Sequence, residues 1–590
     1  MSIVSDIKKM VATSFQKLYN LEVDAANLTI NQTKPEFEGD YTLVLFSFLK
    51  QLKTSPDKLG NEIGEALVND FGEIFTAHNT IKGFLNLTIS DDYWLRFLQE
   101  NFKNKKYGTA PANHQKVMVE YSSPNTNKPI HLGHLRNNFL GWSVAEILKN
   151  IGYDTIKCSI VNDRGIHICK SMIAWQLFAK GATPESTGIK GDHFVGDYYV
   201  KFNEEYKSQV SELVKKGMPE KEAEREAPIM KATQKMLLDW EAGEPEVMEL
   251  WEKMNQWVYD GFDVTYKRIG SDFDKTYYES QTYLLGKKFV EEGLQKNIFF
   301  RKDDGSVWID LTEKGLDEKL VLRKDGTSVY MTQDLGLAEE KYKDYHYNKS
   351  IYVIADEQNY HMKVLQLILQ EAGKPYADGI EHLSYGLVEL PSGKMKSREG
   401  TVVDADDIID EMVAVAKNKT KELGKVNDFE PAELAELYDT IALGALKFFL
   451  LRVDPKKKMV FNPEESIDFH GFTGPFIQYT HARIKSILRK ENPEGDSLKV
   501  VLLKPEKDLL LQLEQYPSIV EQAAAEHNPS VLAIYIFQVA KSFNSFYAEL
   551  SIMKAESKLK KELRLQIASL TARVIASGMH LLGIKVPERM

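Results

Sequence analysis

Two histidines near the start of a predicted helix could bind an anion. In SPNTNKPIHLGHLRNN (123–138), His131 and His134 lie three residues apart, Gly133 lies between them and Lys128 precedes them. Residues at this spacing share a helix face, and a glycine there lets a phosphate or a flat base reach the free backbone N–H groups. A capped helix with ordinary histidine hydrogen bonds would give the same pattern. Half of a metal site would also fit, although no third ligand stands out nearby in the sequence.

A second basic stretch lies far along the chain. LPSGKMKSREGTVV (390–403) carries Lys394, Lys396 and Arg398 between two glycines. An ordinary solvated turn could have this composition. A glycine-flanked loop with three cations also suits a polyphosphate, because it could stabilise the charge that develops on the leaving group. Together, the two stretches predict both halves of a triphosphate site.

The residues around the histidines predict a parallel α/β sheet. Residues 117–121 alternate as in a strand, a helix that Pro129 could open runs to about Asn150, and TIKCSIVND has the pattern of the next strand. Strand, helix and strand in this order form the βαβ unit of a doubly wound, Rossmann-like domain. Ligands bind at the carboxyl ends of such strands, where 120–125 and 162–163 would lie.

The rest of the chain divides around this domain. A chain of 590 residues is too long for one core, so several domains are expected. A charged helical insertion at about 171–297 interrupts the sheet, which resumes with VWIDL, KSIYVIAD and LSYGLVEL. The predicted regions are an N-terminal α+β domain (1–110), the Rossmann-like domain (111–405), a connecting helical region (406–470) and an all-α C-terminal domain (471–590).

The composition excludes some classes of protein. Cys158 and Cys169 are the only cysteines, which rules out a four-thiolate zinc site and a disulfide framework and fits the cytoplasm. No apolar run approaches the roughly 18 residues that span a bilayer, so no membrane partner is expected. The net charge is −11, yet 531–590 carry nine Lys and Arg against four Asp and Glu. Charge alone therefore leaves contact with nucleic acid open.

The motifs taken together resemble those of class I aminoacyl-tRNA synthetases. HLGH and KMKSR are similar to the two signatures of that class, and VEYSSPNTNKPIHLGHLRNN resembles the version found in arginyl-tRNA synthetases. The stretches DGTSVYMTQDLGLA, GFTGPFIQYTHARIKSILRK and VIASGMHLLGIKVPERM add to this likeness, which spans about 117–590. HxGH alone is less specific, because small-molecule nucleotidyltransferases share it. The ordered set of stretches favours the arginyl-tRNA synthetases.

The resemblance implies an ATP-dependent arginine–tRNA ligase. Such an enzyme activates L-arginine with Mg²⁺-bound ATP to arginyl-adenylate and pyrophosphate, then transfers arginine to the 3′-terminal adenosine of tRNA(Arg). The resemblance further implies that activation requires bound tRNA and that the 2′-hydroxyl is charged. It also implies that 1–110 contact the tRNA elbow and that 471–590 bind the anticodon. We expect a cytoplasmic monomer.

The resemblance also assigns site residues. The expected catalytic residues are His131, His134, Lys128 and Lys394. The same four, with Gly133, would bind ATP together with Met395, Ser397, Arg398 and His361. A planar guanidinium needs carboxylates in its plane and an aromatic or hydroxyl neighbour. The predicted arginine-binding residues are Glu120, Ser122, Asn125, Tyr330, Asp334 and Gln358.

The sequence departs from the family pattern in two places. In the basic loop, Lys396 replaces the usual first serine and Ser397 replaces the second lysine, which makes Lys128 the better phosphate ligand. In NDRGIHI (162–168), Arg164 and His167 differ from the usual residues and stay unassigned. Two rival classes remain, a small-molecule nucleotidyltransferase and an RNA-binding relative without catalysis. The long helical C-terminal region disfavours the first rival, and the retained site residues disfavour the second.

The C-terminal region holds both predicted core residues and predicted junction residues. By helical spacing, we expect Ile534, Phe537 and Phe543 to lie in a core. The likeness places Gln478, Tyr479, His481 and Arg483 near the junction with the catalytic domain, while RNA bases would stack on aromatic residues farther along the chain.

Overall fold

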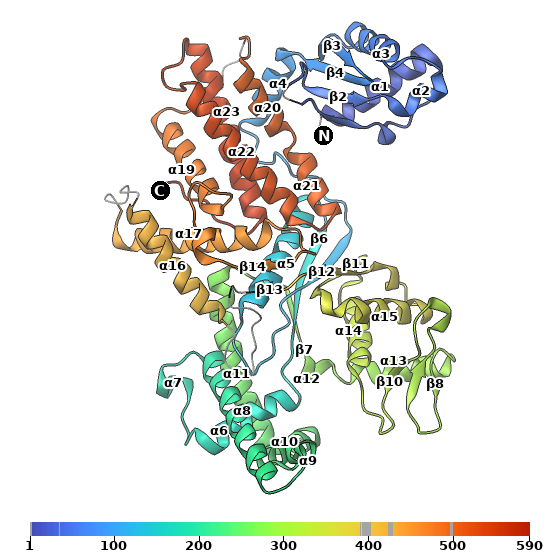
Figure 1. The fold of residues 1–590 in the computed structure, drawn as a ribbon, viewed down its shortest axis with the longest axis vertical. Coiled ribbons are helices and arrows are strands. Elements are labelled where there is room, and N and C mark those ends of the chain that lie inside the picture. Colours follow the sequence, from blue (N-terminus) through green and yellow to red (C-terminus); the bar gives the residue numbers. More distant parts are fainter. Residues whose placement is uncertain (1–2, 35, 390, 392–402, 423–428, 496–498) are drawn as a thin grey trace.

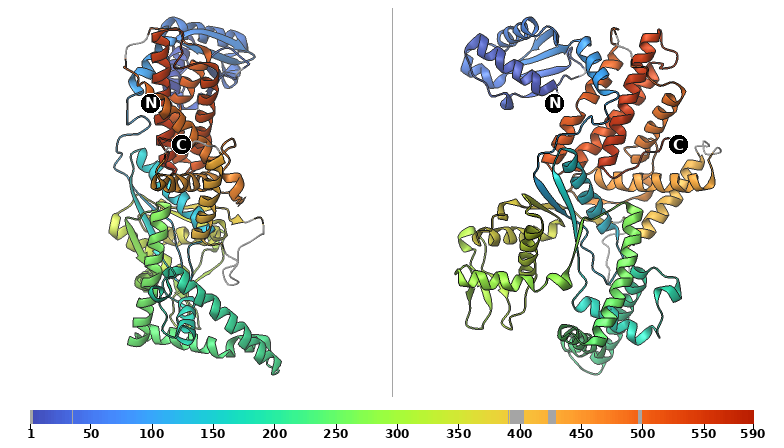
Figure 2. Two further views of the ribbon diagram at one scale, coloured as in Figure 1. Left: turned by 90° about the vertical axis from the view of Figure 1, so that its left-hand side faces the viewer. Right: turned by 180° about the vertical axis from the view of Figure 1, so that it is seen from behind.

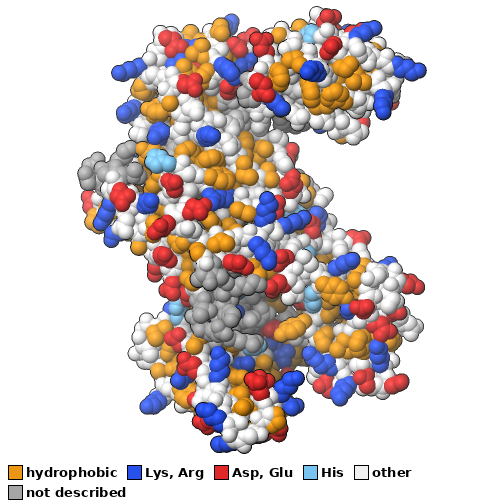
Figure 3. Space-filling model, viewed as in Figure 1, with side chains coloured by type: hydrophobic (Ala, Val, Ile, Leu, Met, Phe, Trp, Pro, Cys, Tyr) orange, Lys and Arg blue, Asp and Glu red, His pale blue; other side chains and the backbone are white. Residues whose placement is uncertain are grey.

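The computed structural model describes the whole chain except residues 1–2, 35, 390, 392–402, 423–428 and 496–498. The molecule is elongated (Figure 1). The N-terminal domain and the C-terminal helices lie at one end, the parallel sheet lies in the middle, and a helical insertion forms the other end (Figure 2). Charged side chains of both signs are spread over the visible face (Figure 3).

A parallel sheet of five strands forms the centre, with the order β12-β11-β5-β6-β7. Glu120 pairs with Cys158 on one side and with Tyr352 on the other, so the carboxyl ends of the strands meet at one edge. This arrangement confirms the predicted doubly wound fold. The strands are β5 (Lys116–Glu120), β6 (Asp154–Val161), β7 (Lys275–Tyr278), β11 (Lys349–Ala355) and β12 (Ile380–Tyr385).

Helices of the catalytic region pack around the parallel sheet. The helix after β5 begins at Leu132, with His131 as its N-cap, and not at Pro129 as predicted. Pro129 therefore belongs to the turn that leads into the helix. The helices are α5 (Leu132–Asn150), α12 (Glu279–Thr282), α13 (Leu285–Gln295), α14 (Tyr330–Tyr345) and α15 (Asn359–Glu371).

Two predictions about the sheet were wrong. β7 pairs in parallel with β6, so the chain returns to the sheet inside the segment 171–297 that was expected to be helical. VWIDL instead forms β9, which lies in a separate antiparallel sheet of three strands. That sheet contains β8 (Phe300–Arg301), β9 (Val307–Ile309) and β10 (Lys319–Leu322).

Helices form the insertion between β6 and β7. Their buried side chains include aromatic residues that pack at right angles to one another, such as Phe194 and Trp257 with ring centroids 5.5 Å apart. The helices are α6 (Ile166–Phe178), α7 (Pro184–Thr187), α8 (Gly191–Lys215), α9 (Glu220–Glu226), α10 (Pro228–Ala242) and α11 (Pro245–Ile269).

The N-terminal domain is an antiparallel sheet covered by helices, in the order β1-β2-β4-β3. Its first helix buries Ile3, Ile7, Val11 and Phe15, while Leu18 is exposed. The strands are β1 (Ile30–Gln32), β2 (Tyr41–Val44), β3 (Phe75–Ile81) and β4 (Phe84–Ile89). The helices are α1 (Ile3–Tyr19), α2 (Phe46–Leu52), α3 (Pro56–Asp70) and α4 (Asp91–Asn101).

The chain after residue 403 is almost entirely helical. Phe543 is buried as predicted and Phe537 is partly buried, but Ile534 is 45% exposed and does not belong to the core. The elements are α16 (Ala405–Glu422), α17 (Pro431–Leu451), α18 (Pro463–Ser466), α19 (Gly474–Lys490), α20 (Lys504–Glu514), α21 (Tyr516–Ala525), α22 (Pro529–Glu549) and α23 (Lys558–Leu581), with β13 (Val388–Glu389) paired to β14 (Met459–Val460).

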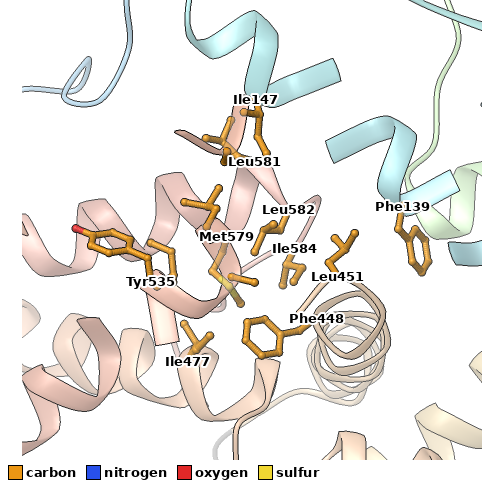
Figure 4. Packing of buried hydrophobic residues seen from close by; sticks show 14 of the residues in the cluster. Phe139, Ile147, Phe448, Leu451, Ile477, Tyr535, Met579, Leu581, Leu582 and Ile584 are labelled. Carbon is orange, nitrogen blue, oxygen red and sulfur yellow. The ribbon is translucent and has the colours of Figure 1, made fainter. Parts of the chain in front are cut away.

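The C-terminal helices pack directly on α5. Phe139 and Ile147 of α5 lie close to Leu451, Leu581 and other side chains of the C-terminal region (Figure 4). The Ser143 hydroxyl donates to the carbonyl oxygen of Leu581 at 2.7 Å. Since both sides of α5 are covered, its sequence is apolar around most of its circumference.

The N-terminal domain docks on the C-terminal helices through a buried carboxylate. Glu514 accepts a hydrogen bond from the backbone N–H of Ile3 at 2.6 Å and from the Tyr41 hydroxyl at 3.1 Å. Lys507 bonds Asp40 at 3.0 Å beside this contact. Among the residues that the structure describes, none of the helices has the length and apolar content to cross a lipid bilayer.

Candidate active site

His131 and His134 form a stacked pair at the N-terminus of α5. Their ring centroids are 3.8 Å apart. His131 Nδ1 accepts a hydrogen bond from the Gly133 N–H at 3.2 Å, and His134 Nδ1 accepts one from the His131 N–H at 3.2 Å. Because a backbone N–H can only donate, both Nδ1 atoms are unprotonated acceptors. In the neutral rings, each Nε2 therefore carries a hydrogen that it can donate to a ligand.

Both rings are held in the neutral form. Burial and, to a smaller extent, the nearby Lys128 lower the pKa of His131 to about 3. Burial also holds the pKa of His134 well below its usual range, with His131 and Lys128 acting in the same direction. The pair thus offers two uncharged donors, and Lys128 supplies the positive charge beside them. Within the described part of the chain, neither histidine shares a metal-binding group with two further ligands.

Gly133 fits closely against the pair. A Cβ atom at this position would lie 3.1 Å from Cε1 of His131. The imidazole would have to shift slightly to admit a side chain here. The basic stretch predicted to complete the phosphate site, with Lys394, Met395, Lys396, Ser397 and Arg398, lies outside the described residues.

The loop after β5 is held by the elements around it. Ser122 is fully buried with φ 58°, a conformation that non-glycine residues seldom adopt. Its hydroxyl shares a hydrogen bond of 2.6 Å with that of Tyr266 and accepts one of 3.1 Å from Asn138. The hydroxyl is therefore already engaged by two partners, and the role of Ser122 in binding arginine stays a prediction. Asn125, which is partly buried, forms a parallel bridge with Asn162 at the sheet edge.

The structure brings two predicted ligands together in a way that the sequence did not indicate. His361 Nε2 lies 2.5 Å from Oδ2 of Asp334. His361 was predicted to bind the nucleotide, but this contact places it beside the predicted arginine-binding residues. The hydrogen bond from Asp334 raises the pKa of His361. Tyr330, one helical turn before Asp334, is 76% exposed, and Gln358 is exposed at the carboxyl end of β11.

Glu120 is engaged inside the protein. It is 4% exposed and forms a buried ion pair with Lys341, whose ammonium lies over the ring of Tyr352. A guanidinium at Glu120 would have to displace this ammonium. Lys341 therefore already neutralises the Glu120 carboxylate, and the role of Glu120 in binding arginine stays a prediction.

Glu279, at the carboxyl end of β7, is a further carboxylate close enough to Asp334 to feel its charge. Burial raises the pKa of Glu279 to about 7; Arg164 opposes this rise, whereas the negative charges of Asp163 and Asp334 add to it. A carboxylate that repels a neighbouring carboxylate favours a cationic ligand between them. The sequence pattern missed Glu279 because β7 was hidden in the predicted helical insertion. The signal that could have found it is the short strand-like run KTYY just before it.

A cavity of about 470 Å³ opens beside these carboxylates. Arg164 lies on its wall with its guanidinium 3.8 Å from the ring centroid of Tyr283, and it pairs with Glu241 at 3.1 Å. The cavity is lined by Glu279, Tyr330 and Gln333 and by the basic residues Arg164, Lys287 and Arg323, among others. It therefore has room for a polar ligand next to the exposed ring of Tyr330.

Asp163 and His167 have structural partners. Asp163 is buried and accepts hydrogen bonds from the Ser280 N–H at 2.8 Å and from the Tyr259 hydroxyl at 2.9 Å. It thereby ties the end of β6 to α11 and α12. His167 lies 3.1 Å from the Tyr199 hydroxyl within the insertion.

A second basic cavity of about 320 Å³ lies in the C-terminal region. Its walls include the aromatic side chains of Tyr479 and Tyr547, and the predicted junction residue Arg483 stacks at 4.9 Å over the ring of Tyr479. Gln478 and His481 instead contact carbonyl oxygens of the last residues, Lys585 at 2.8 Å and Pro587 at 3.0 Å. The cations that line this cavity are Arg483, Arg489, Lys490 and Arg589.

Comparisons with known proteins agree with this architecture. Residues 98–462 match the family described as tRNA synthetases class I (R), catalytic domain. Residues 477–590 match the DALR anticodon binding domain, and 5–89 match the arginyl tRNA synthetase N terminal domain.

Curated relatives and solved structures extend the likeness over the full length. The chain is 51% identical to the arginine–tRNA ligase of Amoebophilus asiaticus over 99% of both chains, and 51% identical to that of Flavobacterium psychrophilum over 100% of both. The structure of arginyl-tRNA synthetase from Thermus thermophilus superposes with a TM-score of 0.81 at 26% identity, covering 99% of both chains. The Plasmodium falciparum enzyme shares the fold, with a TM-score of 0.78 at 19% identity over 100% of this chain and 99% of that one. The chain therefore belongs to the arginyl-tRNA synthetase family of class I tRNA synthetases.

Proposed function

We propose that the chain is an arginine–tRNA ligase whose activation site is built around the histidine pair. The observation that carries this proposal is the tautomer fixed at both rings, which leaves two neutral Nε2–H donors at the start of α5. Neutral donors held in a partly buried site can bind phosphate oxygens with little reorganisation. Family membership supplies the substrates, which are L-arginine, ATP and tRNA(Arg).

In the first step, a carboxylate oxygen of arginine attacks the α-phosphorus of ATP and pyrophosphate leaves. The new bond is a mixed anhydride, and no proton has to move to the protein. The enzyme needs only to align the reactants and to stabilise the charge on the phosphates. His131 and His134 donate to phosphate oxygens, and the Lys128 ammonium neutralises part of the triphosphate charge. ATP enters with Mg²⁺ on its phosphates, and Lys394 of the basic stretch is assigned to their far end.

Arginine is selected by a pair of carboxylates. Asp334 and Glu279 approach from α14 and from the end of β7, and each favours a cation because the other is negative. The planar guanidinium can bond both carboxylates at once, whereas a lysine ammonium lacks the fork geometry. Asn125 and Gln358, at the ends of β5 and β11, are assigned to the polar groups of the amino acid.

In the second step, the 2′-hydroxyl of the terminal adenosine attacks the anhydride carbonyl and AMP leaves. The exposed ring of Tyr330 and the adjoining cavity of about 470 Å³ offer space for this nucleotide. The C-terminal cavity, with two tyrosines and four cations, suits an unstacked anticodon base. We assign the N-terminal domain to the tRNA elbow and expect a monomer.

Pyrophosphate exchange tests this function. We expect exchange of labelled pyrophosphate into ATP with arginine and tRNA(Arg), and none with lysine or glutamine. Removing one preorganised donor should cost about 10²–10³-fold in rate, so His134→Ala should lose exchange by this factor. Exchange with lysine or glutamine but not arginine would contradict the specificity. No exchange with any amino acid plus tRNA would favour a relative that only binds RNA.

A further inference from the structure

The backbone of the histidine pair rests on a segment distant in sequence. The Ala405 N–H donates to the carbonyl oxygen of Ile130 at 2.9 Å, and the Leu132 N–H donates to that of Val403 at 3.4 Å. His131 and Asp404 form the antiparallel bridge between these two bonds. The position of His131 at the N-cap of α5 therefore depends on where 403–405 lie.

Side chains of the insertion hold that segment in place. Lys190 Nζ bonds Oδ2 of Asp406 at 2.6 Å. His193 Nε2 lies 3.1 Å from Asp404 and 3.1 Å from Asp406. Lys190 is the N-cap of α8 and His193 lies in its first turn. We call Lys190, His193, Asp404 and Asp406 the α8 anchor.

An ammonium, and not a metal ion, occupies the centre of this cluster. Asp192, His193 and Asp406 are close enough to one another to ligate a metal. However, Lys190 Nζ already bonds Asp406, Asp192 Oδ2 at 3.0 Å and the Thr265 hydroxyl at 2.6 Å. The other oxygen of Asp192 faces Gly261, where a Cβ atom would lie 2.4 Å from it. The cation that these carboxylates require is therefore built into the chain.

The charged groups of the anchor shift one another's pKa values, although burial still raises the pKa of Asp404 to about 6 against the opposing effect of His193. Burial alone would raise the pKa of Asp406, but hydrogen bonds from His193 and Lys190 hold it well below its usual range. The hydrogen bond to Asp406 also raises the pKa of His193. The side chains of Lys190, Asp404 and Asp406 are 22%, 10% and 18% exposed. Bonds between charged groups this far from water are well ordered and costly to break.

We propose that Lys190 and His193 are positioning residues for the activation step, because they fix Asp404 and Asp406 and thereby the backbone on which His131 rests. This inference rests on the proposed role of His131 as a phosphate donor. It gives the helical insertion a part in ATP activation, although its anchor residues do not touch the histidine rings. A displacement of a reacting group by about 1 Å can cost a hundredfold in rate.

Steady-state pyrophosphate exchange by the full-length enzyme with tRNA(Arg) tests the proposal. We expect Lys190→Met to lower kcat/KM for ATP by about ten- to a hundredfold. The KM for arginine and the Kd for tRNA should change by less than about twofold, since those contacts are separate. Lys190→Arg should restore most of the loss, because it keeps the charge. The matched control is Lys201→Met, which removes an exposed pair with Glu204 on the same helix.

A double-mutant cycle separates this idea from a general loss of structure. If Lys190 acts through His131, Lys190→Met should have little further effect in a His131→Ala background. Independent, multiplicative effects would overturn the proposal, as would equal losses in ATP, arginine and tRNA parameters. Should Lys190→Met fold poorly in thermal unfolding, His193→Gln gives the same test with a smaller change. If His131→Ala itself leaves the ATP parameters unchanged, the proposed function fails and not the anchor.

Discussion

The phosphate side and the arginine side of the site are built in opposite ways. The histidine pair comes from a run of four residues, and hydrogen bonds to the backbone of that run orient both rings, while the α8 anchor holds the run in place. The arginine side joins Glu279, Asp334 and His361 from three separate elements. Burial favours the uncharged form on both sides, so it lowers the pKa of the histidines and raises that of Glu279. It keeps the histidines neutral, and it leaves Glu279 poorly ionised until a cation arrives.

This difference teaches where each side is vulnerable. The histidine pair is formed by one turn at the start of α5, so it should tolerate substitutions elsewhere as long as the position of that turn does not change. A site made from several elements depends on all of them and on the pH, because its carboxylates are coupled. The arginine side should therefore respond to single charge changes and to pH more strongly than the phosphate side does.

Of the charge changes that test this comparison, the loss of a carboxylate on the arginine side should have the largest effect. Asp334→Asn and Glu279→Gln each remove one charge-assisted hydrogen bond, worth about 1.5–3 kcal/mol. We expect either change to raise the KM for arginine by roughly 10- to 150-fold, with the KM for ATP little changed. The measurement is exchange kinetics with arginine varied. Asp303→Asn, an exposed residue of the β8–β9 turn, is the matched control. If either change raised the KM for ATP as much as the KM for arginine, the arginine side and the phosphate side would not be distinct.

The next effect is on pH dependence. Glu279, with a pKa of about 7, is protonated at lower pH and cannot then accept the guanidinium. His361, whose pKa is raised by Asp334, also loses its proton as pH rises and then competes less for that carboxylate. The KM for arginine should fall about tenfold per pH unit at most below pH 7 and level off above it.

The phosphate side should behave differently over the same range. Since the pKa of His131 is about 3 and that of His134 is also low, neither ring titrates between about pH 5.5 and 8. The KM for ATP should therefore vary less with pH than the KM for arginine, and its variation should come from the α8 anchor, where burial raises the pKa of Asp404 to about 6. Glu279→Gln should remove the main pH dependence of arginine binding. The neighbouring charges of Arg164, Asp163 and Asp334 are unchanged in this variant. If the KM for ATP varied as steeply as that for arginine, the two sides would not be distinct.

The smallest effect concerns Lys128, the one charge that we assign to the phosphate side near the histidines. Lys128→Ala should raise the KM for ATP by about five- to tenfold, the size expected for a partly solvated charge near a phosphate. Lys149→Ala, at the exposed end of α5, is the control. Unchanged activation would show that Lys128 does not replace the lysine missing from the basic stretch.

The sequence predicted what depends on local pattern. The βαβ unit, its ligand edge and the histidine pair follow from short runs of residues, and the structure has them where the pattern placed them. The partner of the Ser122 hydroxyl could not be predicted, because residue type does not reveal that Tyr266, far along the chain, lies against it. Glu279 was missed because a strand of four residues between charged helices has too little pattern to stand out. The contacts of His361 and Glu120 could not be predicted either, because their partners come from other elements.

The carboxylate of Glu514 has a consequence for how the chain comes into being. Its partner Tyr41 precedes it by 473 residues, and Ile3 precedes it by 511. At about 5–20 residues per second, a ribosome needs roughly 25 to 95 seconds to make the interval after Tyr41. The N-terminal domain leaves the exit tunnel long before the helix that receives it exists. Its docking is therefore one of the last events of biosynthesis. Until then, the surface of the N-terminal domain around Tyr41 is exposed to solvent.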